Sequence, residues 1–585
     1  MEKWKPVFRL GHAQTTKGSM RQPLIAAVTL LAGSLLVGLG LCALLPPFEG
    51  FDETAHYSYI QQIAQTGSWP HLNDPIAAEV EEYLRLAPSS RALNGRWSYP
   101  VFFAESPETI RAGAAAIHAG RDPARPWRTG KGNNWEGQHP PLYYAVLAPL
   151  WSVSKGWSIH AQLVLLRSAS YLLAWGGLVL VTVSIARTNA ESPVAPLLVV
   201  APALWPALFP MWFPEMARLG NDSLVLLLLA AAWIVTAKAV GPRGKTSHFA
   251  LLGVVCGLGL LTKATVLPFV AALGLFLAWR TWRTRNDAVA LRTSMLQLLV
   301  FCLVTGAIAG GWYTKNLIDS GDILGSNDAV TLDRQGGLLK GLNESFSLPK
   351  AVRGLGATAM TFLWVGTWSA TLPPRILEIP LGILVIVIAA GWISSALRTQ
   401  RVSSLDAIAM LTLALFIAAL LRQTLIFIAV YAVYSGSAWY LHSLAPLLAP
   451  MVGRGLIEAA TWRRARPAVI ALLAYPLLFL PFATALQLFH YAGCLAPPIH
   501  EPHVGLSAVA ACAAAPRELL GHLAVLGSPA LGLSLFGAGW LAMLTGVAVV
   551  IARAIAAAPP ARGGIPSPAD KARRNPSGSL PASGA

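Results

Sequence analysis

The sequence predicts an all-α polytopic membrane protein, and three of its properties indicate this fold class. The chain has 585 residues, of which 55% are hydrophobic and only 12% are charged, which is about half the charged fraction of a soluble globular protein. Its mean hydropathy is +0.55. Apolar runs long enough to span a bilayer recur from end to end, and they are continuous rather than alternating, which excludes a transmembrane β-barrel.

Spanning helices are predicted from runs of roughly 17–25 apolar residues, and twelve such runs are present. The first run follows a basic start and has no small-residue cleavage site after it, so we expect a retained helix rather than a signal peptide. The tail beyond the last run is rich in Pro, Gly, Ala and Ser, which is typical of disorder. In chain order, the predicted helices cover residues 23–45, 160–187, 193–213, 222–240, 247–262, 264–281, 292–312, 376–398, 405–432, 441–459, 467–490 and 527–552.

The distribution of charge predicts the orientation of these helices. The net charge is +17, which by itself would also suit a nucleic-acid-binding protein. The Lys and Arg residues, however, gather in short loops and tails on one side of the predicted spans, as they do in cytoplasmic loops, and no basic stripe is interleaved with aromatic residues. We therefore expect a multi-pass protein of the cell (inner) membrane, with both termini cytoplasmic, membrane lipid as a partner and no nucleic acid.

The predicted topology divides the chain into five parts. Juxtamembrane helices are expected in the first and fourth outer loops, and those of the first loop cover residues 53–66, 76–87, 104–118 and 141–155. The five parts are a cytoplasmic N-terminus (1–22), a module of spans (23–312) that contains the first outer loop (46–158), an outer loop with a surface helix (313–375), the C-terminal spans (376–552) with the outer loop 491–526, and a cytoplasmic tail (553–585).

The stretch FEGFDETAHY, residues 48–57, contains three acidic residues, Glu49, Asp52 and Glu53, just after the first predicted helix. Asp52 is expected to cap a new helix that carries His56 four residues later on the same face. A carboxylate at a helix N-terminus stays ionised, and an ionised acid at the membrane surface suits a general base. The alternative is that Asp52 only caps the helix, while Glu53 and His56 are solvated.

A metal site is a second alternative for the same residues. DETAH is similar to the helical HExxH pattern of zinc proteases, but its first residue is an acid instead of a histidine, so the match fails. We assign no metal ligands, and a divalent cation held by Asp52, Glu53 and His56 stays open.

Five motifs, in order along the first 325 residues, carry a resemblance to a known superfamily. They are PPFEGFDETAHYSYIQQIAQTGSWP, GQHPPLYYAVLAPLW, FPEMARLGNDSLVLLLLAAAW, GLGLLTKATVLP and GGWYTKNLIDSGDILG. The ordered set resembles the GT-C glycosyltransferase superfamily, and more narrowly a bacterial membrane-protein family related to the protein mannosyltransferases. The late motif SGSAWYLHSLAPLLAP departs from the pattern, because Trp439, Tyr440 and His442 stand where such relatives often carry an arginine.

The resemblance implies a sugar transfer on the outer face of the membrane. GT-C enzymes take a sugar from a polyprenyl-phosphate carrier and pass it to an acceptor, which here would be a glycan, lipid or protein of the cell envelope. A carboxylate in the first outer loop acts as the base. By motif position that residue is Asp52, with Glu53 as the nearest substitute and His56 as a supporting group. Direct attack by the acceptor inverts the anomeric centre.

A lipid phosphate also needs cations, which directs attention to the ionisable residues in and near the spans. At the centre of a span such a residue costs roughly 2.5–3.5 kcal/mol on the insertion scale, so each calls for a reason. Arg218, Lys263 and Lys315 lie on the outer side within matched motifs and are the best phosphate candidates. The alternative for any of these cations is snorkelling or an internal ion pair, with Glu215 or Asp222 neutralising Arg218. The full set of expected substrate-binding residues is His139, Arg167, Arg218, Asp222, Lys263, Lys315, Arg422 and His442.

The motif HPPLYY precedes the second predicted span. His139 is expected to line the site. Tyr143 and Tyr144 are expected to anchor the chain at the membrane interface, because tyrosine favours the headgroup level.

Two of the five cysteines flank the last outer loop. If Cys494 and Cys512 are oxidised, they close a loop of about 17 residues, and such a bridge contributes ~3 kcal/mol in the chain-entropy model. An oxidising outer compartment permits the bridge. The alternative is a pair of free thiols.

A membrane transporter or a flippase for lipid-linked saccharides is the rival function. Twelve spans with both ends inside are common among transporters. Such folds usually show two similar halves, whereas this chain has one large, acid-bearing outer loop directly after its first helix. The sequence therefore favours the enzyme over the transporter.

Overall fold

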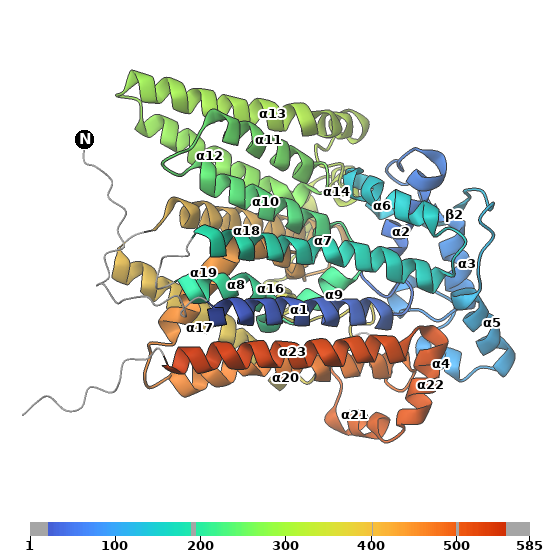
Figure 1. Ribbon diagram of the computed structural model, residues 1–585. Helices are drawn as coiled ribbons and strands as arrows, with labels where there is room; N and C mark the ends of the chain where they lie inside the picture. The colour runs from blue at the N-terminus through green and yellow to red at the C-terminus, as the bar shows by residue number, and fades with distance from the viewer. Residues whose placement is uncertain (1–20, 189–194, 401, 499–501, 557–585) are drawn as a thin grey trace, which may run out of the picture.

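The computed structural model describes residues 21–188, 195–400, 402–498 and 502–556. Long helices lie side by side in it, and shorter helices and a small sheet gather at one end of them (Figure 1). The predicted fold class, an all-α polytopic membrane protein, is thereby confirmed. Most of the predicted N-terminal region and of the predicted tail falls outside the described residues.

Nine helices of the described residues are long and apolar enough to cross a membrane, or ten if α21 (Leu506–Ala513) and α22 (Pro516–Leu526) form one bent span. The prediction of twelve spans is therefore not confirmed. The long helices are α1 (Arg21–Leu44), α7 (Ile159–Thr188), α10 (Asp222–Ala239), α12 (Leu267–Arg283), α13 (Ala288–Ser320), α17 (Ile379–Thr399), α18 (Ser404–Tyr431), α20 (Arg466–Tyr491) and α23 (Pro529–Ala556).

The three remaining predicted segments form shorter helices. They are α8 (Ala195–Leu208), α11 (Thr246–Leu260) and α19 (Ala445–Ala459). The run predicted over 193–213 is shorter because it divides into α8 and a separate turn of helix, α9 (Trp212–Ala217). Pro210 lies in that break, and proline cannot donate the backbone hydrogen bond that would continue a helix.

Helices from the two ends of the chain pack directly on each other, since α1 and α23 run side by side (Figure 1). Glycines face one another across this contact, Gly33 of α1 opposite Gly539 of α23 and Gly40 opposite Gly532. Gly546, seven residues after Gly539, packs against Leu30. A Cβ on Gly539 would lie 2.5 Å from the Gly33 carbonyl oxygen. Small residues let helix backbones approach closely where lipid supplies no hydrophobic driving force.

The connection between α1 and α7 covers residues 45–158, and we call it the first long connection. It contributes most of the short elements at that end of the bundle (Figure 1). Helices are present at the predicted positions as α2, α3, α5 and α6, but α2 is largely buried instead of lying at the surface. The sheet was not predicted. Its strands pair antiparallel, with Pro75 opposite Asn133 and Ala77 opposite Thr129. The elements are α2 (Glu53–Thr66), β1 (Pro75–Ala77), α3 (Ala78–Leu86), η1 (Arg91–Leu93), α4 (Tyr99–Phe103), α5 (Pro107–His118), β2 (Thr129–Asn133), η2 (Trp135–Gln138) and α6 (Leu142–Val153).

Later connections add further short elements. The segment predicted as an outer loop over 313–375 contains more than one helix, and a 3-10 segment precedes α19. These elements are η3 (Ala264–Val266), α14 (Asn327–Arg334), α15 (Leu338–Ser345), α16 (Leu348–Leu363), η4 (Arg375–Leu377) and η5 (Ala438–Leu444).

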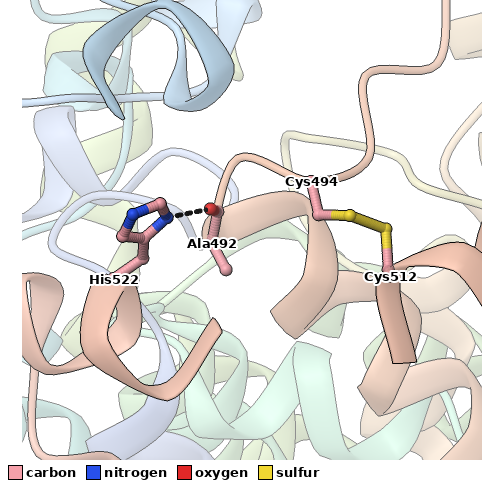
Figure 2. Close-up of a disulfide and its surroundings, with 4 residues drawn as sticks. All are labelled: Ala492, Cys494, Cys512 and His522. Atoms are coloured by element: carbon pink, nitrogen blue, oxygen red, sulfur yellow. Dashed lines mark hydrogen bonds between the residues drawn. A yellow bond between two sulfur atoms is a disulfide. The ribbon is translucent and has the colours of Figure 1, made fainter. Parts of the chain in front are cut away.

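Cys494 and Cys512, the candidate pair of the last predicted outer loop, form a disulfide across a separation of 18 residues. The bridge joins the end of the α20 segment to α21 (Figure 2). The imidazole of His522 on α22 hydrogen-bonds through Nδ1 to the carbonyl oxygen of Ala492 at 2.8 Å. The bridge and this bond both hold the bent α21–α22 pair against the end of α20.

The glycine contact between α1 and α23 gives a stability prediction. Gly539→Leu should lower the free energy of unfolding by about 1–3 kcal/mol or more, because overpacking forces the two backbones apart. The matched control is Gly537→Leu on the same helix, where a Cβ would meet nothing within 4 Å. Thermal unfolding in detergent measures both variants, and equal losses in the two would contradict the packing account.

Candidate functional site

Asp52 lies immediately before α2, but it does not cap this helix. Its backbone is in the left-handed region, with φ 61°, and its side chain makes no cap hydrogen bond. Capping side chains usually reach the first turn from extended backbone, so this conformation explains the difference from the expected N-cap. Oδ1 instead accepts a hydrogen bond from the Trp135 indole Nε1–H at 2.8 Å. Among the described residues, Oδ2 has no hydrogen-bond partner, and the residue is only half-buried.

The electrostatic surroundings of Asp52 differ from those expected of a capping carboxylate. Burial and the nearby Glu136 carboxylate raise the pKa of Asp52 to about 6, although Arg218 and Lys263 act in the opposite direction. The Asp52 carboxyl therefore exchanges its proton near neutral pH, which is the range in which a general base is effective.

Glu136, on η2, is a second carboxyl of the site, and the sequence reasoning missed it. Its Oε2 accepts a hydrogen bond from the Tyr144 hydroxyl at 3.0 Å and lies 3.3 Å from His139 Nε2. Burial raises the pKa of Glu136 to about 7, while burial lowers that of His139 to about 3. The sequence did contain a feature that could have pointed to this residue: Glu136 directly precedes the GQHPPLYY motif, in a chain with few acidic residues.

His56 joins α2 to this cluster as a neutral imidazole. Burial and the positive charge of Arg218 hold the pKa of His56 well below its ordinary value. Its Nδ1 lies 3.0 Å from the Tyr144 hydroxyl oxygen, and its Nε2 lies 3.5 Å from the Arg218 guanidinium. Because the Tyr144 hydroxyl donates to Glu136 and the guanidinium can only donate, the His56 proton is on Nδ1.

Tyr143 and Tyr144 lie inside the protein and are not the interface anchors that the sequence suggested. Both are fully buried. Tyr144 stacks on Tyr59 of α2 with ring centroids 3.6 Å apart, and Tyr143 pairs with Ser170 of α7 at 2.9 Å. These contacts to two helices take both tyrosines away from the surface.

Arg218 and Lys263 lie in the same buried cluster, each with acidic partners. Arg218 contacts Glu215 at 2.7 Å and Asp222 at 3.1 Å, and donates to the Phe51 carbonyl oxygen at 3.0 Å. Together with a second bond to Glu215 and the contact to His56, these bonds occupy all five of its N–H donors. The neutralisation foreseen as an alternative for Arg218 is therefore present.

Lys263 uses fewer of its hydrogen-bond donors than Arg218 does. Its Nζ donates to Asp222 Oδ2 at 2.7 Å and lies 4.2 Å from the centre of the Tyr440 ring. Among the described residues this is its one hydrogen bond, so two of its three donors are free. The other Asp222 oxygen, Oδ1, is buried and has no hydrogen-bond partner among the described residues. The Lys263–Asp222 pair therefore keeps unused hydrogen-bonding capacity on both of its members.

The late motif reaches the same cluster through η5. Trp439 stacks on Phe51, with ring centroids 4.7 Å apart and an interplanar angle of 2°, and Tyr440 contacts Lys263. The third residue of this motif, His442, is fully buried between the Trp205 Nε1–H at 3.2 Å and the Phe362 carbonyl oxygen at 3.1 Å. Trp439 and Tyr440 thus bring two aromatic rings of η5 to the cluster.

Glu53 and Arg167 form a separate, completely buried ion pair. The guanidinium donates to both Glu53 oxygens, at 2.8 and 2.5 Å, and to the carbonyl oxygens of Leu45 and Pro46 at 2.6 and 2.8 Å. Glu53 also accepts the Leu219 backbone N–H at 2.8 Å. Neither charged group has access to a ligand, so both hold the chain in place instead of binding substrate or acting as the base.

The other expected binding residues lie outside this cluster. Lys315 pairs with Asp319 at 2.7 Å on α13 and lines a separate polar cavity. Arg422 is exposed on α18. The described residues contain no group of three or more His, Cys, Asp or Glu side chains that could hold a metal ion.

The buried pair predicts a specific effect on stability. Arg167→Met should cost about 3–5 kcal/mol of folding free energy, because it leaves the Glu53 carboxylate buried without its cation. Adding Glu53→Gln to Arg167→Met should recover part of the loss. Arg422→Met is the matched control at an exposed arginine. Thermal unfolding of the four proteins provides the measurement, and an Arg167→Met variant as stable as the control would refute this role.

No protein-family model matches the chain, and a search of curated proteins found no match. The structure is similar to that of ArnT from Cupriavidus metallidurans bound to undecaprenyl phosphate, with a TM-score of 0.41 and 14% identity over 91% of this chain and 78% of ArnT. It is also similar to the Archaeoglobus fulgidus oligosaccharyltransferase in complex with Zn and sulfate, with a TM-score of 0.37 and 15% identity over 80% of this chain and 52% of that protein.

A further structure of the archaeal protein, AglB with an inhibitory peptide and a dolichol-phosphate, has a TM-score of 0.34 and 14% identity over 82% of this chain and 55% of its own. The chain thus spans about half the length of the archaeal oligosaccharyltransferase. TM-scores below 0.5 are too low to assign an activity, so the activity has to be argued from the residues of the site.

Proposed function

We propose that this chain is an integral membrane glycosyltransferase that moves a sugar from a polyprenyl-phosphate-linked donor to an acceptor, a glycan, lipid or protein of the cell envelope. The Asp52 carboxyl carries the proposal. One of its oxygens is held by Trp135, the other has no partner among the described residues, and its pKa is raised to about 6. Such a group is mostly ionised at pH 7 and still accepts a proton readily, as a general base must.

In the proposed reaction, the acceptor hydroxyl gives its proton to Asp52 Oδ2 while its oxygen attacks the anomeric carbon of the donor sugar. The bond from that carbon to the phosphate oxygen breaks, and the polyprenyl phosphate leaves with the electron pair. Attack opposite the leaving group inverts the anomeric centre. The products are the glycosylated acceptor, the lipid phosphate and a protonated Asp52.

Lys263 is the proposed contact for the donor phosphate. Two of its N–H donors have no hydrogen-bond partner among the described residues, and its charge is close enough to Asp52 to lower that residue's pKa. Cationic donors stabilise the negative charge of a departing phosphate. Arg218 has no free donor, so its proposed role is to hold Asp222, Glu215 and the Phe51 carbonyl in place around the base.

The proposed orientation puts the first long connection outside the cell. Asp222 begins α10 in the site, and Lys238 lies 16 residues further along the same helix, or ~24 Å at 1.5 Å per residue. Basic residues at that opposite end favour the cytoplasm. The Cys494–Cys512 disulfide favours an oxidising compartment for its own end. We therefore propose a protein of the cell (inner) membrane with both termini in the cytoplasm.

The Asp52→Asn variant tests the proposed base. Sugar transfer from radiolabelled polyprenyl-phosphate sugars to membrane acceptors should fall by about 10²–10⁴-fold, the usual contribution of a general base. The assay uses the full-length protein in lipid nanodiscs. Donor binding should persist, because the amide retains the size of the side chain and can still contact Trp135.

Asp122→Asn is the matched control for this test. Asp122 is exposed in the same long connection, where its carboxylate accepts the Ala124 N–H at 2.8 Å, and its replacement should leave transfer unchanged. Full transfer by the Asp52→Asn variant would show that Asp52 is not the general base. A wild-type protein that moves lipid-linked sugars across the bilayer without transferring them would favour the flippase instead.

A further inference from the structure

A polar cavity of about 510 Å³ lies beside η2, outside the cluster around Asp52. Its walls come from the turn before β1, from η2, from the end of α13 and from α14. Most of the lining atoms are polar. The side chains that matter for a ligand are Gln138, Lys315, Asn316, Asp319, Asp333 and Arg334.

Asn316 lines the cavity, and its amide carries a buried hydrogen-bond donor that is unmet among the described residues. The residue is only 7% exposed, and its Nδ2 has no hydrogen-bond partner among the described residues. Gly325 lies against the same carboxamide with φ +65°, and a Cβ there would come within 2.9 Å of it. The glycine therefore leaves room for the amide in the cavity wall. A buried donor without a partner costs free energy that a ligand oxygen would recover.

The charges of the lining residues balance. Lys315 and Arg334 are opposed by Asp319 and Asp333, and Lys315 and Asp319 already form an ion pair of 2.7 Å. A phosphate or another polyanion would meet two carboxylates there. An uncharged ligand with many hydroxyl groups fits better, because amides, carboxylates and cations can each donate to or accept from a hydroxyl.

The short helix η2 connects this cavity to the proposed base. Its first two residues belong to the site, since Trp135 bonds to Asp52 and Glu136 bonds to Tyr144. Its last two residues, Gly137 and Gln138, line the cavity. A ligand in the cavity is therefore separated from the site by a single turn of chain.

We propose that this cavity binds the uncharged sugar of a carbohydrate acceptor, so that the acceptor is a glycan or a glycolipid headgroup. Asn316 and Gln138 contact its hydroxyl groups, and the Lys315–Asp319 pair contacts one side of the ring. Trp312 lies one helical turn before Asn316 and meets Trp69 edge-on, with ring centroids 6.3 Å apart. The identity of the ligand as the acceptor rests on the proposed glycosyl transfer, whereas sugar binding in the cavity does not.

Saturation-transfer NMR of the full-length protein in nanodiscs tests the cavity directly. The probes are the methyl glycosides of glucose, galactose, mannose and N-acetylglucosamine, with inorganic phosphate followed by ³¹P NMR. At least one glycoside should bind the wild type, and Asn316→Leu should weaken it about threefold to tenfold, the effect of one lost hydrogen bond. Asn343→Leu makes the same chemical change at an exposed site on α15 and should bind as the wild type does.

A second pair of variants separates this proposal from the proposed function and from misfolding. Val330→Trp, which fills the cavity from α14, should abolish binding, whereas Asn316→Leu only weakens it. Asp52→Asn should bind glycosides normally although its transfer of sugar is strongly reduced. Glycoside binding that is absent in the wild type, or equal in wild type, Asn316→Leu and Val330→Trp, would overturn the proposal. Binding of phosphate alone that depends on Asn316 would overturn it too. Normal transfer by Asp52→Asn would refute only the function of Asp52.

Discussion

The buried ion pair between Glu53 and Arg167 is the interaction on which the rest of the site depends. Arg167, on α7, binds the carbonyl oxygens at the end of α1 together with Glu53 at the start of α2. Glu53 in turn accepts the Leu219 N–H beside Arg218. The pair therefore fixes the position of Asp52, which precedes Glu53 in the chain, and that of Arg218, which precedes Leu219. Losing either partner would leave a charge buried without compensation, so the pair holds three separate segments in a single arrangement.

The candidate site contains more carboxyl groups than cationic side chains. Two cations, Arg218 and Lys263, face four carboxyl groups, those of Asp52, Glu136, Glu215 and Asp222. Carboxyls crowded together in a buried place cannot all ionise at their usual pH. Burial is the main cause that raises the pKa of Asp52 to about 6 and those of Glu136 and Glu215 to about 7. Burial, with a smaller contribution from the Glu136 carboxylate, thus brings the pKa of the proposed base into the range where it can take up and release a proton near neutral pH.

The sequence predicts much of this arrangement, but it does not show which residue has which role. The motifs in the first half of the chain named Asp52, Arg218 and Lys263, and the hydropathy pattern located the long helices, because burial in lipid constrains composition strongly. Arg167 was expected to bind substrate and instead pairs internally, since a buried cation carries the same sequence signal in either role. Glu136 was missed because only the fold brings η2 to α2. The twelve predicted spans exceed those found because three of the apolar runs, those of α8, α11 and α19, form helices of only 14 or 15 residues, and composition alone does not show where a helix breaks.

The pH dependence of transfer by the wild type and by Glu136→Gln tests the central claim most directly. The proposed base acts only when it is ionised, so the wild-type rate should rise with pH through about 6 and level off above about 7. In Glu136→Gln the rising limb should move to lower pH, because the Glu136 carboxylate is one of the groups that raise the pKa of Asp52. A wild-type rate that does not change between pH 5 and 8, or a limb that stays in place when Glu136 is neutralised, would contradict the account.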